Sequence, residues 1–222
     1  MSGSNENILR KHLCYISKKM DEAGLTSFFG VYAPGNLSAR ITNSNRILIT
    51  PSGLPKGKLK PDDLVMVDIY GRKIKGKYKP SIETPLHCAI YRQRTDVNGV
   101  VHVHAPMSLA YAIAHKEVPA TTIELAAVTG GNVPIAPYAT PATEELAKIT
   151  AARLGLGSAV LMANHGLVAV GQNLDEAFNI ALSVEYTAAI NIYAKIIGEV
   201  KKIPLKEVSK IRKFIVKRYG QK

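Results

Sequence analysis

Cysteine is scarce in this chain, which has only Cys14 and Cys88 among its 222 residues. Both stand in helix-like contexts, so we expect two buried thiols in a reducing compartment rather than a disulfide. No apolar run approaches the roughly 20 residues of a membrane-spanning helix, and the polar N-terminus is unlike a secretory signal. There is no linker rich in Pro, Ser or Gly and no internal repeat. We therefore expect one cytoplasmic domain over residues 1–222, with a basic tail or helix at 203–222.

Acidic residues are also few. The chain has 17 Asp and Glu against 29 Lys and Arg, which gives a net charge of +12. Much of the excess lies in residues 72–79 and near the C-terminus. Such a charge favours an anionic partner, but the chain has no helix-turn-helix, zinc-finger or aromatic-basic RNA-binding motif. We therefore expect no nucleic-acid or membrane partner, and interpret the charge as a solvated surface beside an anionic small-molecule substrate.

Two histidines stand two residues apart in the stretch 99–106, after a pair of valines that favours a strand. Strand side chains alternate between faces, so His102 and His104 would point to one side. Val101 and Val103 would point to the other. Two imidazoles on one strand face form half of a chelating site for a borderline metal such as zinc. The alternative is a pair of solvated histidines on a half-exposed strand.

A third histidine and a glutamate extend this pattern. The apolar run 159–170 is broken by Asn164-His165-Gly166, where glycine would let the chain turn sharply and present His165 at a strand end. Three histidines with an open position are typical of a catalytic zinc site. Glu83 stands at the head of an expected helix. It can be a ligand at rest and a base when substrate displaces it, with a pKa raised by partial burial.

Hydrophobic periodicity predicts a layered α/β chain. Apolar spacing and caps predict helices at 5–23, 83–94, 106–114, 143–154, from Asn173 or Asp175 to 197, and in the tail after 204. Short apolar runs predict strands at 37–42, 46–50, 64–70, 100–104, 133–137, 159–163 and 167–170, with a basic hairpin at 71–79. We interpret His87 as a helix-face residue rather than a metal ligand. For the tail, a packed terminal helix and a subunit contact both remain open.

These residues occur in an order and spacing that resembles a known family. The metal and base motifs are Glu83, His102-x-His104 and Asn164-His165-Gly166. They resemble those of the class II aldolase/adducin family, and the match extends over about residues 36–197. The segments 35–40 and 50–53 are similar to the family's phosphate-binding loops. His-x-His is common alone, but four ordered motifs at the family's spacing make a specific pattern.

The resemblance implies a three-layer α/β/α fold with a central, mainly antiparallel sheet, and a ring-shaped homotetramer with active sites between subunits. It implies one zinc ion per chain, bound by His102, His104 and His165, with Glu83 as resting ligand and catalytic base. The implied reaction is reversible cleavage of a ketose 1-phosphate, such as fuculose 1-phosphate, into dihydroxyacetone phosphate and an aldehyde such as lactaldehyde. The residues implied in phosphate binding are Asn36, Ser52, Gly53 and Ser81.

Departures from the family's pattern keep other activities open. Ser81 is followed by Ile82 where the family's aldolases have two consecutive serines, so one phosphate donor is missing or supplied elsewhere. Glu124 falls where those aldolases have a tyrosine that assists protonation, and it resembles the acid of the family's methylthioribulose-phosphate dehydratases. Tyr219 could match a second catalytic tyrosine. We expect an aldolase with Glu124 as a second acid. A dehydratase or a sugar-phosphate epimerase is the alternative, and a non-enzymatic adducin-like scaffold is least favoured.

Overall fold

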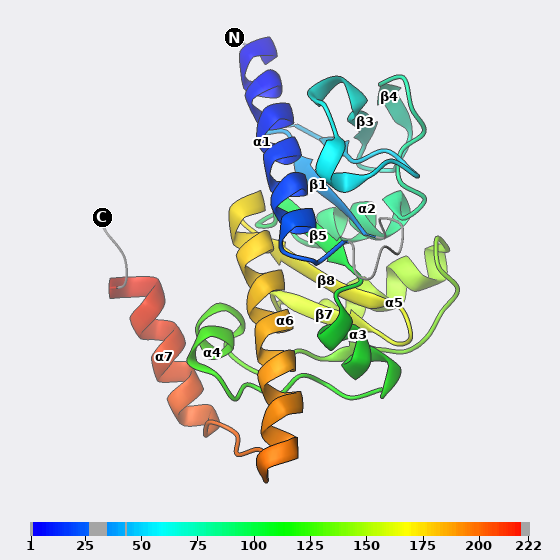
Figure 1. Cartoon of the computed structure of the whole chain (residues 1–222). Helices are drawn as coiled ribbons and strands as arrows, with labels where there is room; N and C mark the ends of the chain where they lie inside the picture. Colours follow the sequence, from blue (N-terminus) through cyan, green and yellow to red (C-terminus); the bar gives the residue numbers. More distant parts are fainter. Residues whose placement is uncertain (1, 27–34, 43, 219–222) are drawn as a thin grey trace.

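The computed structural model describes residues 2–26, 35–42 and 44–218 (Figure 1). Within this part the chain forms an eight-stranded sheet in the order β4-β3-β2-β1-β5-β8-β7-β6. The strands are β1 (Asn36–Arg40), β2 (Arg46–Ile49), β3 (Val65–Asp68), β4 (Lys73–Lys75), β5 (Gly99–Val103), β6 (Ile135–Ala136), β7 (Ala159–Met162) and β8 (Gly166–Gly171). Neighbouring strands pair antiparallel except β6 and β7, which are parallel, so the sheet is mixed.

Helices lie where the sequence predicts them, with shifted ends, and α4 and two 3₁₀ helices are added. They are α1 (Ser2–Glu22), α2 (Thr84–Gln93), α3 (Pro106–Ile113), α4 (Ile123–Thr129), α5 (Glu144–Leu154), α6 (Leu174–Ile197), α7 (Leu205–Arg218), η1 (Lys56–Lys58) and η2 (Pro61–Asp63). Thr143 and Asn173 cap α5 and α6 with their side chains, as expected. The prediction of an α/β chain is confirmed.

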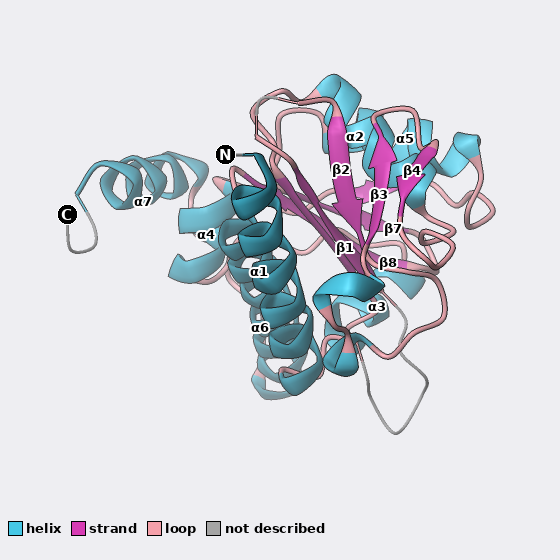
Figure 2. Ribbon diagram, turned by 90° about the horizontal axis from the view of Figure 1, so that it is seen from above, coloured by secondary structure: helices cyan, strands magenta, loops and turns pink. Residues whose placement is uncertain are grey.

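Helices α1 and α6 lie on one side of the sheet and α2 and α5 on the other (Figure 2). The two faces of the sheet bury separate apolar clusters. Because strand side chains alternate, Val101 of β5 belongs to one cluster and Val100 to the other. The first cluster includes Leu13 of α1 and Ile180 of α6, and the second includes Leu86 of α2. With β5 held between β1 and β8, the buried centre of the sheet is a rigid support for side chains at the strand ends.

Helix α6 corrects one expectation from the sequence. Within the described residues, it is the one helix long and apolar enough to cross a membrane by length and composition. However, Leu174, Ile180 and Val184 are buried in the cluster that α6 shares with the sheet. A core helix with such a buried face passes the same test. The length and composition of α6 therefore say little about a membrane.

Both cysteines are free, as the sequence predicts. Cys88 is buried and Cys14 is half-buried. Burial raises the pKa of the Cys88 thiol to about 12 and that of the Cys14 thiol to about 11. Both side chains therefore stay protonated and unreactive at neutral pH.

The basic tail forms α7, which packs beside α4 (Figure 1). Val208 is fully buried with Ala120 and Ala126. Arg212 donates a hydrogen bond from Nη1 to the carbonyl oxygen of Val128 at 2.8 Å. Of the two interpretations of the tail, these contacts favour a packed terminal helix. Tyr219 lies outside the described residues.

Candidate active site

His102 is fully buried, and a backbone contact determines which of its nitrogens carries the proton. It lies in β5 opposite Asn36 of β1 and Val168 of β8. Its Nδ1 is 3.0 Å from the carbonyl oxygen of Leu167, which can only accept a hydrogen bond. The proton of a neutral His102 is therefore assigned to Nδ1, and the lone pair on Nε2 is left for a metal.

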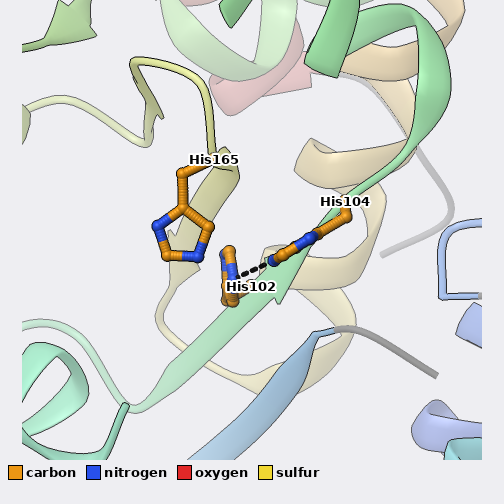
Figure 3. Close-up of side chains that lie close together, drawn as sticks. All are labelled: His102, His104 and His165. Atoms are coloured by element: carbon orange, nitrogen blue, oxygen red, sulfur yellow. Dashed lines mark hydrogen bonds between the residues drawn. The ribbon is translucent and has the colours of Figure 1, made fainter. Parts of the chain in front are cut away.

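His104 and His165 place their rings beside that of His102 (Figure 3). His104 follows the last residue of β5, and His165 lies in the turn between β7 and β8. The ring centroid of His104 is 4.7 Å from that of His102, and the centroid of His165 is 5.0 Å from each of them. One ligand nitrogen from each ring lies within 4.8 Å of the others. The structure therefore brings the three predicted histidines together.

The sequence suggested that Gly166 allows the sharp turn at His165, but its neighbour Asn164 has the turn conformation. The left-handed residue of the turn is Asn164, with φ of 57°. Gly166 already begins β8. A Cβ at this position would lie 2.5 Å from the carbonyl oxygen of Val103 and 3.1 Å from the rings of His102 and His104. Gly166 is therefore needed for the close approach of its backbone to two site histidines, not for a sharp turn.

Glu83 completes the cluster from the N-terminal end of α2, where the sequence placed it. Its Oε2 lies 2.9 Å from Nε2 of His102, and its Oε1 lies 3.1 Å from Nε2 of His165. Asn36 donates a hydrogen bond from Nδ2 to Oε2 at 2.9 Å. Glu83 is only 5 % exposed, so the carboxylate is held largely out of water. We name His102, His104, His165 and Glu83 the histidine end of the site.

The pKa of Glu83 shifts in the direction opposite to the prediction. Burial disfavours the carboxylate, but His102 and His165 outweigh burial and hold the pKa of Glu83 below its ordinary value. Burial also opposes a charged His102, whose pKa is nevertheless raised because Glu83 lies beside it. For His104, burial and the two neighbouring histidines lower the pKa to about 3. The ring of His104 is therefore neutral at physiological pH, as metal binding requires.

The chemistry of the histidine end fits a divalent metal. Nε2 of His102 lies 2.9 Å from Nε2 of His104, so two nitrogens that can act as ligands converge. Nε2 of His165 lies 3.1 Å from Oε1 of Glu83, so the third ring also turns a nitrogen toward the carboxylate beside His102. A cation would account for several nitrogen and oxygen lone pairs that lie this close together inside the protein. Three imidazoles and a carboxylate suit zinc and similar divalent ions.

A buried chain of hydrogen bonds behind Glu83 was missed from the sequence. Nε2 of His87 is 2.5 Å from Oδ1 of Asn36, and Nδ1 of His87 is 2.6 Å from the hydroxyl of Ser38. Tyr91 donates to the carbonyl oxygen of Ser38 at 2.9 Å. Because an amide oxygen only accepts, His87 is assigned as donor from Nε2 and acceptor at Nδ1. This order turns Nδ2 of Asn36 toward Glu83.

Residue spacing could have revealed this chain. Glu83, His87 and Tyr91 are four residues apart and share one face of α2. Asn36 and Ser38 are two apart and share one face of β1. His87 is fully buried on this face of α2 and is not one of the three clustered histidines. Burial, with His102 nearby, lowers the pKa of His87 to about 3, so its ring stays neutral.

A cavity of about 520 Å³ opens beside the histidine end. The predicted site residues that line it are Asn36, Ser52, Gly53, Ser81, Glu83, His104 and His165. Lys56 also lines it and was missed from the sequence. Glu124 does not line the cavity but lies exposed on α4. The chain therefore brings the predicted phosphate and metal residues to one cavity, and leaves Glu124 outside it.

Two loops form the other end of the cavity and are joined by backbone hydrogen bonds. The N–H of Ser52 donates to the carbonyl of Lys79 at 3.1 Å. The N–H of Ser81 donates to the carbonyl of Thr50 at the same distance. Gly53 has φ of 73°, a left-handed conformation that favours glycine. We name Ser52, Gly53 and Ser81 the anion end of the site.

Comparison with known proteins identifies the family. Residues 11–192 match the sequence pattern of the Class II Aldolase and Adducin N-terminal domain. The chain belongs to the class II aldolase and adducin family. It is 38 % identical over 212 residues to the 5-deoxy-D-ribulose 1-phosphate aldolase of Bacillus thuringiensis, covering 96 % of this chain and 97 % of that protein.

Two further relatives agree with this assignment. The L-fuculose phosphate aldolase of Escherichia coli is 40 % identical over 156 residues, covering 70 % of this chain and 71 % of that protein. Among solved structures, an L-fuculose 1-phosphate aldolase is similar with a TM-score of 0.88 and 35 % identity, covering 94 % of this chain and 96 % of that one. The resemblance seen in the sequence is confirmed.

The match to this family and to named aldolases also confirms the prediction that the chain is an enzyme. The chain is a metal-dependent lyase, and the non-enzymatic scaffold interpretation is set aside. Class II aldolases use a divalent metal, and this chain has a three-histidine cluster that can hold one. A sugar phosphate fits the family as substrate.

Proposed function

We propose that this protein is a zinc-dependent aldolase that reversibly cleaves a ketose 1-phosphate into dihydroxyacetone phosphate and a short aldehyde. One observation carries the proposal, namely that the histidine end and the anion end line the same cavity. The Bacillus thuringiensis relative is named as an aldolase of 5-deoxyribulose 1-phosphate, which is the first candidate substrate and would yield acetaldehyde. Other relatives are named as aldolases of fuculose 1-phosphate, which is the second candidate substrate and would yield lactaldehyde.

In this proposal His102, His104 and His165 hold the ion, with Glu83 as a further ligand at rest. Bound zinc supplies a Lewis acid that stabilises negative charge on substrate oxygens. The Nδ1 contact of His102 with the carbonyl of Leu167 keeps its ring in the orientation and tautomer that a ligand needs. The buried surroundings of these side chains keep competing water away.

Glu83 is proposed as the group that moves the proton. In cleavage the C3–C4 bond breaks and its electron pair stays on C3, which receives a proton that Glu83 first takes up from solvent. In condensation Glu83 removes that proton, for which it must be a carboxylate, and its lowered pKa keeps it in that form. The hydrogen bond from Asn36 orients the carboxylate. The C4 hydroxyl proton would leave to a second acid–base group, for which the resemblance offers Tyr219; its other candidate, Glu124, does not line the cavity of its own chain.

The anion end is proposed to bind the substrate phosphate. Ser81 accepts a hydrogen bond at Oγ from the N–H of Glu83 at 3.2 Å, which leaves its hydroxyl hydrogen to donate to a phosphate oxygen. Ser52 and Gly53 would add a hydroxyl and backbone dipoles of the turn. Asn36 keeps a second amide hydrogen on Nδ2 for the substrate. Binding at this end converts remote binding energy into orientation of the reacting carbons.

Assembly and location belong to the same proposal. We propose a cytoplasmic, single-domain, three-layer α/β/α protein with a mainly antiparallel sheet, supported by apolar clusters on both faces and the strand pairings. A homotetramer with active sites between subunits is proposed from the family resemblance. It is supported by the C-terminal half of α6, where Tyr193, Ile196 and Ile197 are exposed.

A dehydratase or an epimerase is less favoured than an aldolase. Eliminating water from methylthioribulose 1-phosphate needs an acid close to the leaving hydroxyl. Glu124 was the residue that favoured this activity, and it is exposed on α4 and does not line the cavity of its own chain. No described side chain replaces it in that position.

Product analysis with a panel of ketose 1-phosphates tests the proposal. Zinc-loaded protein would be incubated separately with 5-deoxyribulose, fuculose and methylthioribulose 1-phosphates, and dihydroxyacetone phosphate measured by coupled reduction. We expect equal amounts of dihydroxyacetone phosphate and aldehyde, loss of activity on exhaustive chelation, and recovery with zinc. Loss of water without carbon–carbon cleavage would instead identify a dehydratase. Equal turnover of non-phosphorylated ketoses would contradict the role of the anion end.

A further inference from the structure

A lysine is buried in the wall of the cavity. Lys56 opens η1 and is only 3 % exposed, yet it lines the same cavity as Ser52 and Ser81. Its ammonium donates one hydrogen bond, from Nζ to the carbonyl oxygen of Leu54 at 2.9 Å. Within the described residues it forms no ion pair with a carboxylate. An ammonium has three donors, so this cation has hydrogen-bonding capacity left over beside the anion end.

Contacts with α1 fix the backbone of Lys56 in this place. The hydroxyl of Ser17 donates to the carbonyl oxygen of Lys56 at 2.8 Å. At Gly57 an added Cβ would meet the side chain of Asp21, so the turn lies close against the end of α1. The backbone of Lys56 therefore cannot move away from the wall without breaking contacts between η1 and α1.

The position of this charge is costly for the folded chain. Burial lowers the pKa of Lys56, and Asp21, which does not pair with it directly, opposes this effect only in part. Buried charges are ordinarily paired. Ser52, Gly53 and Ser81 are neutral donors, whereas a phosphate monoester carries almost two negative charges at neutral pH. A positive charge beside the phosphate would stabilise its binding. The metal cannot supply this charge, because it would lie at the opposite end of the cavity.

We propose that Lys56 supplies the positive charge of the anion end and pairs with the phosphate of the bound substrate. This inference rests on the proposed function, because it assigns the phosphate to the end where Lys56 lies. Lys56 becomes a substrate-binding residue that the family motifs did not identify. Its charge is neutralised when the site is occupied, which explains why a lysine without a carboxylate partner is retained inside the wall.

Calorimetric titration of zinc-loaded, full-length protein with dihydroxyacetone phosphate tests the proposal. Lys56→Met keeps the apolar stem and removes the charge, and we expect its dissociation constant to rise roughly ten- to a hundredfold. The matched control is Lys58→Met, which removes the same charge from an exposed position in the same 3₁₀ helix. We expect that control to change the constant by less than about twofold. Zinc content and thermal unfolding of each variant show whether the site and the fold are intact.

Several outcomes would overturn the inference. One is a Lys56→Met protein that holds zinc and binds dihydroxyacetone phosphate as tightly as the unaltered chain. Another is an equal loss in Lys58→Met, which would show a general charge effect. If Lys56→Met fails to fold, Lys56→Gln is measured against the same expectation. If the unaltered chain cleaves a ketose 1-phosphate but Lys56→Met binds dihydroxyacetone phosphate normally, the inference alone would be refuted. If Lys56→Met loses binding but the unaltered chain cleaves no ketose 1-phosphate, the proposed function alone would be refuted. No binding by the unaltered chain would refute both.

Discussion

The histidine end and the anion end of the cavity are built in different ways. At the histidine end, His102 and Glu83 are 0 % and 5 % exposed, and the side chains of the cluster lie within contact of one another. At the anion end, Ser52 and Gly53 are exposed on a turn, and backbone hydrogen bonds hold their loop beside Ser81. The first end depends on the positions of side chains and the second on the course of two loops. Substitutions should therefore abolish function at the first and weaken it at the second.

The largest expected effect is at the centre of the histidine end. His102→Ala removes a buried ligand and should lose most of the metal, with aldol cleavage falling on the order of a thousandfold or more. Metal analysis of purified protein and cleavage rates measure both. His12→Ala is the control, because His12 pairs with Asp175 at a distance from the cavity. Full metal content and activity in His102→Ala would refute the proposed ligand set.

Glu83→Gln should distinguish metal binding from proton transfer at the histidine end. The amide keeps the shape of the side chain but cannot act as a base, so cleavage should fall at least about a hundredfold. Exchange of the C3 proton of dihydroxyacetone phosphate with deuterated water should fall by a similar factor, while zinc content falls much less. Proton exchange at the unaltered rate would show that another group is the base.

The histidine end was predictable from the sequence because strand alternation alone places His102 and His104 on one face. His165 and Glu83 followed from a broken apolar run and a helix start. The pKa direction of Glu83 was not predictable in the same way. Burial was visible in the sequence pattern, but the effect of His102 and His165 depends on distances of 2.9 Å and 3.1 Å that only the folded chain shows.

The rest of the site depends on contacts between segments distant in sequence. Nε2 of His87 contacts Asn36 of β1, and Lys56 lines the cavity beside the anion end. Spacing places His87 on the same face of α2 as Glu83, but it does not identify the strand that this face packs against. Helices with clear caps, such as the one that begins after Thr143, were predictable for the opposite reason, because a cap is a local hydrogen bond. Glu124 was assigned by counting along the chain, and counting does not give its distance from the cavity.

A milder effect is expected at the anion end. Ser81→Ala removes one neutral hydrogen bond to the phosphate and should raise KM for the ketose 1-phosphate roughly tenfold. The maximal rate should fall only as far as phosphate binding orients the reacting carbons. Ser183→Ala on α6 removes a hydroxyl that bonds within its own helix and is the control. A fall in kcat as large as that of Glu83→Gln would contradict the contrast between the two ends.

His87→Gln should change stability at acid pH more than activity at neutral pH. The pKa of His87 is 6.5 when unfolded and about 3 when folded, so the unfolded chain binds more protons between these values. The free energy of unfolding should therefore fall as the pH drops from 6.5 toward 3, by up to about 1.4 kcal/mol per pH unit from this group. Glutamine cannot be protonated there, so urea unfolding of the metal-free variant should depend less on pH. An unchanged pH slope would contradict a neutral, buried His87.

Glu124→Gln should have the smallest effect, because Glu124 is exposed on α4 and belongs to neither end of the cavity. Removing a solvated charge should change both the cleavage rate and proton exchange on dihydroxyacetone phosphate by less than about twofold. Two other results are distinguishable. Slower cleavage with unchanged proton exchange would mean that Glu124 acts as the second acid. In the described fold this requires that α4 of a neighbouring subunit reaches the cavity. Loss of water elimination from methylthioribulose 1-phosphate would identify a dehydratase. Measuring both rates on this single variant therefore tests whether the histidine end and the anion end of one chain make a sufficient active site.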